Sequence, residues 1–134
     1  MANEATKIED GYVPAVMRTI LNATAVEKGT LMELNDNNIV NVSSGSGVFG
    51  GVANAEKVAS DGAVKIGCDM DGVYDMTTAP GAAITVGQLV SLSGANLIKT
   101  ATEAEIAAGK AVGKAEETST LASSEVIRVR LLGF

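Results

Sequence analysis

The stretch GTLMELNDNNIV, residues 29–40, decides the fold, because a similar stretch, GQLVSLSGANLI, follows at residues 87–98. In each stretch, apolar residues stand on both sides of a cluster of Asn, Asp, Ser or Gly, as in two short strands joined by a tight turn. Aligning Gly29 with Gly87 also aligns Asn38 with Asn96, so the two turns match in position. The sequence therefore predicts two similar β-hairpins.

The similarity continues beyond the hairpins once the register shifts by a few residues, as expected if a helix is inserted in the second copy. The matching features are then Gly51 and Ala53 with Gly113 and Ala115, and a strand at Val64 with one at Val126. Chance convergence of hairpin sequences is the alternative. A real repeat predicts two quasi-repeats, about 15–76 and 77–134, that pack face to face or close on each other within one β domain over 15–134.

Two segments alternate apolar and polar residues, as half-buried strands do. The residues expected to face inward are Val64, Ile66, Cys68 and Met70 in the first segment, and Ile127, Val129 and Leu131 in the second, where Arg128 and Arg130 face water. One short helix is predicted over 102–109, with Thr102 and Glu105 as a capping box and Gly109 at its end. Short strands with frequent turn signals predict an all-β fold with one short helix, as a small β-barrel or β-sandwich.

Residues 1–14 are polar, carry both charge signs and end at Pro14, which holds its neighbour extended. They predict an extended N-terminal arm ahead of the β domain. Fully extended, a segment of this length reaches about 45 Å, far enough to touch a subunit that the body does not cover. A frayed terminus is the alternative interpretation.

The charge balance argues against nucleic acid and membrane as partners. The chain has 10 basic and 16 acidic residues, a net charge of -6, so its field repels phosphate polymers and anionic lipid surfaces. Its four aromatic residues are too widely spaced for a base-stacking platform. A single cysteine and an N-terminus without the pattern of a signal peptide indicate synthesis in a reducing cytoplasm.

The sequence predicts no catalytic residues, no metal site and no cofactor. The chain has no histidine, which removes the commonest general base and the usual zinc ligand. Cys68 lies on the apolar face of its strand and is expected to be a core residue. Asp69 and Asp71 begin like a calcium loop, but Pro80 stands where the bidentate Glu is needed, so a solvated strand end is the favoured interpretation. An enzyme would have to rely on Asp or Glu pairs alone.

Three phrases carry a resemblance to a known family: AITVGQLVSL at 83–92, GKAVGKA at 109–115 and VIRVRL at 126–131. With the polar start and the small-residue β repeats, they resemble phage capsid cement proteins. The chain is also broadly similar to the lambda-type head decoration proteins. The likeness covers most of the chain from about Val13.

The resemblance implies a homotrimer on the outer capsid surface of the virion, made in the host cytoplasm, that joins neighbouring major capsid proteins after the head expands. In such proteins an N-terminal arm orders on the shell, and the residues expected to bind the capsid here are Ile8, Tyr12, Val13 and Pro14. Leu132 and Phe134 are the candidates for a subunit interface. The alternative is a tail or fibre accessory domain that binds a host surface, which the scarcity of aromatic residues disfavours.

Overall fold

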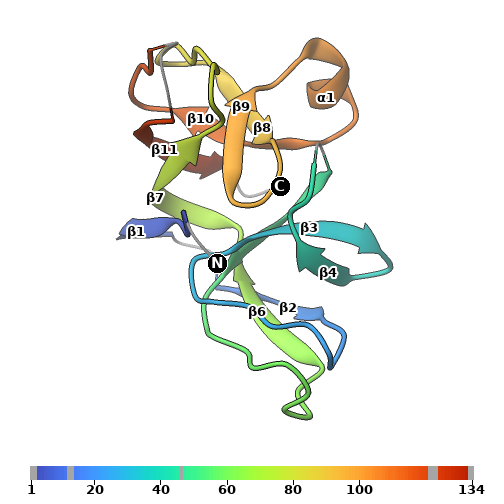
Figure 1. Ribbon diagram of the computed structural model, residues 1–134. Coiled ribbons are helices and arrows are strands. Elements are labelled where there is room, and N and C mark those ends of the chain that lie inside the picture. Colours follow the sequence, from blue (N-terminus) through green and yellow to red (C-terminus); the bar gives the residue numbers. More distant parts are fainter. Residues whose placement is uncertain (1–2, 12–13, 46, 121–123, 133–134) are drawn as a thin grey trace.

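The computed structural model describes residues 3–11, 14–45, 47–120 and 124–132. In these ranges the chain forms short strands and one helix (Figure 1). The elements are β1 (Thr6–Asp10), β2 (Val16–Thr19), β3 (Leu31–Asp36), β4 (Ile39–Val42), β5 (Val48–Ala53), β6 (Lys65–Asp69), β7 (Asp71–Thr78), β8 (Leu89–Leu92), β9 (Leu97–Thr100), α1 (Glu103–Ala107), β10 (Ala111–Ala115) and β11 (Val126–Leu132).

The strands form two closed five-stranded barrels, one below the other in Figure 1. The first barrel has the order β2-β4-β3-β5-β6. The second has the order β7-β11-β10-β8-β9 and is closed by a parallel pairing of β7 with β9, while β1 lies on the outer side of β7. This confirms the predicted all-β class with one short helix and selects a barrel over a sandwich. Closure leaves no open edge within either barrel.

The two barrels share the same pairing scheme at matching positions. Thr19 pairs with Ile39 in the first barrel as Thr77 pairs with Leu97 in the second, both in parallel. The turn residues Asn38 and Asn96 both have a φ of 58°. The similar hairpins at 29–40 and 87–98 therefore take equivalent places in two similar barrels. The repeat boundaries at about 15–76 and 77–134 stay a prediction.

The core is divided between the barrels but continuous across their junction. Apolar side chains such as Met32, Val40 and Cys68 fill the first barrel, whereas Leu31 and Val52 on the opposite faces of their strands join the core of the second. β3 and β5 are thus buried on both faces, because one face lines a barrel and the other packs on its neighbour.

Hydrogen bonds from a hairpin tip hold the two barrels together. The backbone N–H of Leu31 donates to Oδ1 of buried Asn96 at 2.9 Å, and the Ser43 hydroxyl donates to the carbonyl of Gly94 at 2.9 Å. The β8–β9 turn of the second barrel is therefore hydrogen bonded to the first barrel. Polar groups buried in this way need such partners, so the junction has a fixed geometry.

Most of the expected inward-facing residues are confirmed. Ile66, Cys68 and Met70 are buried, as are Ile127, Val129 and Leu131. The prediction for Val64 is wrong: it is 50% exposed, because β6 begins only at Lys65 and Val64 lies in the loop before it. The helix is confirmed, with the capping box between Thr102 and Glu105 present and Gly109 at a φ of 75° just beyond it.

The extended N-terminal arm is not confirmed, because Thr6–Asp10 forms β1 and pairs antiparallel with β7. The backbone N–H of buried Ala5 also donates to the Gly29 carbonyl at 2.7 Å. The reason lies in β7, which is longer than its partner on that side. β9 pairs only with Thr77 and Thr78, so the earlier part of β7 offers unpaired backbone groups that β1 takes up.

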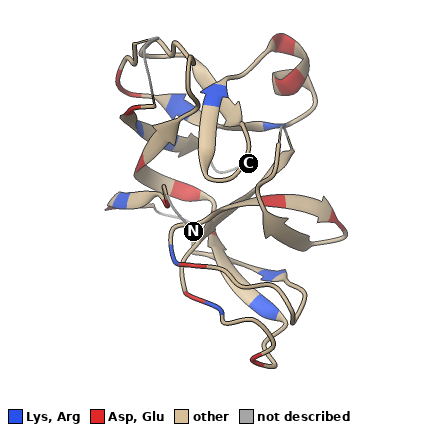
Figure 2. Cartoon of the chain, viewed as in Figure 1, with Lys and Arg blue, Asp and Glu red and all other residues tan. Residues whose placement is uncertain are grey.

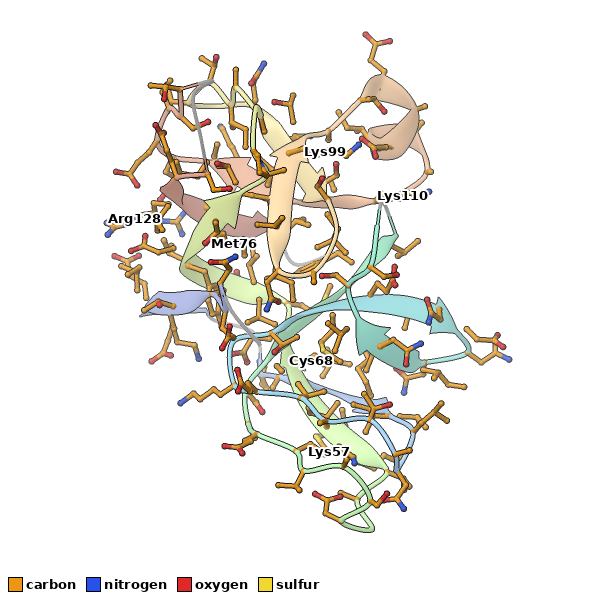
Figure 3. The ribbon with its side chains drawn as sticks, viewed as in Figure 1. Lys57, Cys68, Met76, Lys99, Lys110 and Arg128 are labelled. Carbon is orange, nitrogen blue, oxygen red and sulfur yellow. The ribbon has the colours of Figure 1, made fainter. Side chains whose placement is uncertain are left out.

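Lys57 is a buried cation that ties two loops of the first barrel together (Figure 3). Its amine donates to the carbonyls of Asn22 at 2.7 Å and Thr24 at 3.1 Å, and pairs with Asp61 at 3.2 Å. The charge is therefore hydrogen bonded on several sides, which a buried ammonium group requires.

Replacing Lys57 by Met is expected to lower the free energy of unfolding by about 2–4 kcal/mol, because it leaves the carbonyls and the carboxylate that this buried amine links without their common donor. Chemical denaturation measures the change. The control is Lys65→Met, which removes an exposed lysine that donates to the Thr19 hydroxyl at 3.2 Å and should change stability by less than about 0.5 kcal/mol. Equal effects of the two substitutions would contradict this role of Lys57.

Candidate functional site

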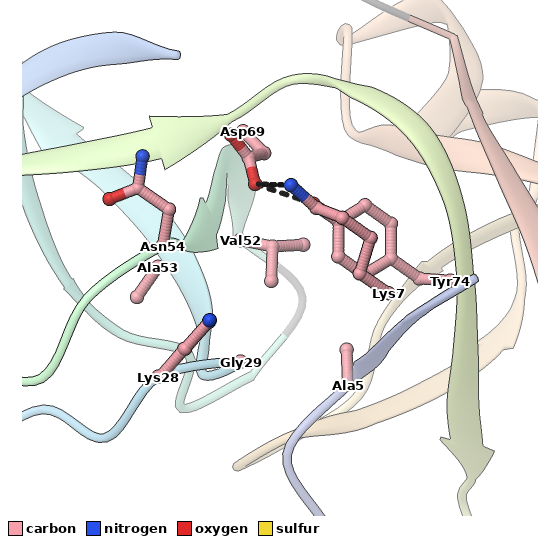
Figure 4. Close-up of a pocket in the computed structure, with 9 residues that line it drawn as sticks. All are labelled: Ala5, Lys7, Lys28, Gly29, Val52, Ala53, Asn54, Asp69 and Tyr74. Carbon is pink, nitrogen blue, oxygen red and sulfur yellow. Dashed lines mark hydrogen bonds and ion pairs between the residues drawn. The ribbon is translucent and has the colours of Figure 1, made fainter. Parts of the chain in front are cut away.

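A cavity of about 400 Å³ lies where β1, the first barrel and β7 meet (Figure 4). Ala5 and Lys7 line it from the N-terminal segment, Val52 and Asn54 from the first barrel, and Tyr74 from β7. These residues are far apart in the sequence and are brought together by the pairing of β1 with β7. Gly29 is required at this place, because its φ is +92° and the Ala5 carbonyl packs directly against it.

Asp69 is the hub of one wall of the cavity. It accepts a hydrogen bond from the Tyr74 hydroxyl at 2.6 Å and pairs with the Lys7 amine at 3.1 Å. Burial and the carboxylate of Asp69 raise the pKa of Tyr74 well above its ordinary range, so Tyr74 stays a neutral donor. Burial alone would lower the pKa of Lys7, but its bonds to Asp69 and Asp10 outweigh burial and raise it. We call Lys7, Asp69 and Tyr74 the latch, because their contacts hold β1 against the end of β6.

The opposite wall carries polar groups that are not engaged in this way. Lys28 is exposed, and its amine is directed into the cavity in Figure 4. No hydrogen bond or ion pair joins this amine to another residue within the described ranges. Asn54 stands over Gly67, where a Cβ would lie only 2.7 Å from its Oδ1. The cavity thus has one latched wall and one open wall.

The residues predicted to bind the capsid fall on β1 and the segment that follows it. Ile8 lies in β1 at a break in the register and is 37% exposed. Pro14 is exposed, while Tyr12 and Val13 lie outside the described residues. Their roles stay a prediction.

Of the residues predicted at a subunit interface, Leu132 ends β11 and is 37% exposed, and Phe134 lies outside the described residues. Leu132 pairs with Asp71, and the neighbouring Gly72 pairs with Asp10 at the end of β1. The structure therefore brings the end of β1 and the end of β11 to the same place, on either side of the start of β7.

Charged residues of both signs are mixed over the two barrels (Figure 2). On the outer face of the second barrel, Arg130 pairs with Glu9 of β1 at 3.7 Å and with Glu116 at 3.1 Å, which links neighbouring strands. Exposed ion pairs of this kind contribute little to stability, so the two pairs of Arg130 mainly set the charge pattern of this face.

Metal ligands do not gather anywhere in the described part of the chain, where no group of three or more His, Cys, Asp or Glu could hold an ion. Asp69 is already engaged with Lys7 and Tyr74, and Asp71 accepts from the N–H of Gly72 at 2.9 Å. Among the same residues, no helix is long and apolar enough to cross a membrane.

Comparison with known protein families decides the class of the protein. Residues 14–131 match the family described as phage cement protein. The matched range includes strands of both barrels. The chain belongs to the phage cement protein family. The family is structural, not enzymatic, and this cement protein is associated with the capsid of the virion. A search of the curated proteins finds no match.

The family match confirms the resemblance inferred from the three sequence phrases and favours the capsid role over a tail or fibre module. The cavity of the cement protein, in contrast, has no signature in the sequence. Lys7, Lys28 and Asp69 share no spacing that signals a site, because only the closure of the barrels and the docking of β1 bring them together. The presence of lysine residues in a chain of net negative charge is the sequence feature that comes nearest to indicating this cavity.

Cys68 lies inside the first barrel of the cement protein, and burial raises the pKa of its thiol to about 11 (Figure 3). The expectation that it is a core residue is confirmed. The thiol of the unfolded chain has a pKa of about 8.5. The contribution of the neutral Cys68 thiol to the free energy of unfolding is therefore fully present below that pH and is lost as the pH rises toward 11.

We expect Cys68 of the folded protein to react with an aromatic disulfide reagent at pH 8 at least about a hundredfold more slowly than in denaturant, because the thiolate is the attacking species. Absorbance of the released thiol measures the rate. The denatured protein is the control that the thiol is intact. Rapid labelling of the folded protein would show that Cys68 is accessible and the barrel open.

Proposed function

We propose that this cement protein binds the outer surface of the expanded phage head and stabilises it by bridging neighbouring major capsid proteins. The observation that carries the proposal is the rigid junction of two barrels. The buried Asn96 side chain and the shared apolar core fix the barrels to each other, so one chain presents two outer surfaces at a fixed separation. A body of this kind can contact two subunits and resist their separation.

β1 supplies a means of attachment that needs no reactive group. All five of its residues are exposed, and among the described strands it pairs with β7 alone, on one side. A capsid segment could add to the other side as a further strand, with backbone hydrogen bonds giving affinity and side chains such as Ile8 setting the register. The break in register at Ile8 and the charges of Lys7, Glu9 and Asp10 are features that limit unspecific pairing of such an edge.

A homotrimer would multiply weak contacts of this kind. Each copy brings one β1, and three linked contacts raise overall attachment by factors of about 100 to 10,000 where all can be engaged together. The end of β11 supports a subunit contact near β1, because Leu132 is a partly exposed apolar residue beside the start of β7. Phe134 is proposed to share this contact.

Deleting residues 2–14 should leave both barrels folded but weaken attachment to expanded, undecorated heads at least about tenfold, because the exposed strand is lost. Ile8→Asp should produce a similar loss, since it places an uncompensated charge in the proposed contact. Sedimentation of heads with bound protein measures the affinity. The matched control is Val58→Asp, which changes a 61% exposed apolar residue in the loop between β5 and β6 and should bind within about twofold of wild type. Full attachment of both β1 variants would discard this mechanism.

Leu132→Lys should convert the proposed trimer to monomers, because it places a charge in an apolar subunit contact. Sedimentation equilibrium against the chain mass of 13.6 kDa measures the oligomeric state. Leu21→Lys is the control, since Leu21 is 59% exposed but lies in the loop that follows β2 of the first barrel. A wild-type monomer, or a trimer indifferent to Leu132→Lys, would remove this interface from the proposal.

A further inference from the structure

The cavity beside β1 has a charge that its own residues do not balance. Lys7 is paired with Asp69 at 3.1 Å and with Asp10 at 3.2 Å. Lys28, on the open wall, has no such partner within the described residues, so the lining carries one excess positive charge. This stands out in a chain with a net charge of -6.

Nearby carboxyl groups form no ion pair with the Lys28 amine within the described residues. Glu27 and Glu4 are close in space and share a hydrogen bond, which raises the pKa of Glu4 and lowers that of Glu27. Neither lines the cavity. The Lys28 amine and the exposed Asn54 amide are therefore available donors on one wall.

The fold does not require a lysine at position 28, as the second barrel shows. The Gly29 N–H donates to the Ala53 carbonyl at 2.8 Å, and at the matching place the Gly87 N–H donates to the Ala115 carbonyl at the same distance. The residue before the glycine is Lys28 in one barrel and exposed Val86 in the other. The same turn forms without a lysine, so the fold alone does not account for Lys28.

The size and lining of the cavity indicate what it would hold. At about 400 Å³ it falls within the roughly 300–1,000 Å³ range of ligand sites, and Ala5, Val52 and the Tyr74 ring make part of its lining apolar. One excess positive charge matches a singly charged group, and the Asp69 carboxylate on the far wall disfavours a doubly charged phosphate.

We propose that this cavity binds the side-chain carboxylate of a Glu or Asp on the capsid protein. Lys28 and Asn54 donate to the carboxylate, and the apolar lining contacts the methylene groups of the same side chain. The assignment rests on the proposed cement function and deepens it, because it places a charged anchor beside the exposed β1 strand. Such an anchor would fix the register of strand addition and make attachment sensitive to salt.

The first test uses expanded, undecorated heads. Lys28→Glu should weaken attachment at least about tenfold, and Lys28→Met should weaken it by a smaller factor, because only the first substitution adds repulsion. Lys114→Glu is the matched control: it makes the same charge change at an exposed lysine of β10 and should bind within about twofold of wild type. Unchanged thermal unfolding shows that each variant is folded. Attachment of Lys28→Glu equal to that of Lys114→Glu would overturn the assignment while leaving the cement function intact.

The second test needs no capsid. An acetylated and amidated Ala-Glu-Ala tripeptide, titrated into nitrogen-15-labelled protein, should shift the amide signals of Gly29 and Asn54 in a saturable way. The matching Ala-Gln-Ala tripeptide should not, and Lys28→Met should abolish the response to the Glu peptide. Equal responses to the two peptides, or none, would overturn the assignment. If the Glu peptide binds but the wild-type protein does not attach to heads, the cement function fails and the carboxylate site stands.

Discussion

Each barrel depends on one short parallel pairing that joins its first strand to the second strand of its hairpin. In the first barrel this is the contact of Thr19 with Ile39, reinforced by the hydrogen bond from the Thr19 N–H to the Asn38 carbonyl at 2.8 Å. In the second barrel Thr77 and Thr78 make the equivalent contact with β9. Without it, each sheet would have two open edges, and strands this short would gain little from pairing on one side alone. The turn asparagines, at positive φ, direct each hairpin back to this contact.

The same constraint explains where β1 lies. Because β9 reaches only the last residues of β7, the earlier part of β7 is left for another strand, and the N-terminal segment fills it. The docking of β1 in turn encloses the cavity against the first barrel, with Asp69 as the common partner of Lys7 and Tyr74. The exposed strand and the cavity are therefore consequences of one difference in strand length.

Local patterns in the sequence were sufficient for the elements but not for their long-range contacts. The capping box of Thr102 and Glu105, the alternation in β11 and the matching hairpins depend on neighbouring residues, and the structure confirms them. The alternation that placed Val64 inward failed because periodicity does not show where a strand begins. The docking of β1 and the latch at Asp69 depend on residues more than sixty positions apart, so composition and spacing gave no sign of them.

The two hairpin tips, although equivalent in the repeat, differ in their tolerance to change. The tip of the second barrel ends in Asn96, which is fully buried and holds the junction, so added residues there would separate the barrels. The tip of the first barrel projects into solvent, with Asp36 and Asn37 exposed. A foreign peptide inserted between Asp36 and Asn37, ahead of the Asn38 contacts that close the barrel, would extend away from the junction without disturbing it, which makes this point of the first hairpin suited to displaying an epitope on the molecule.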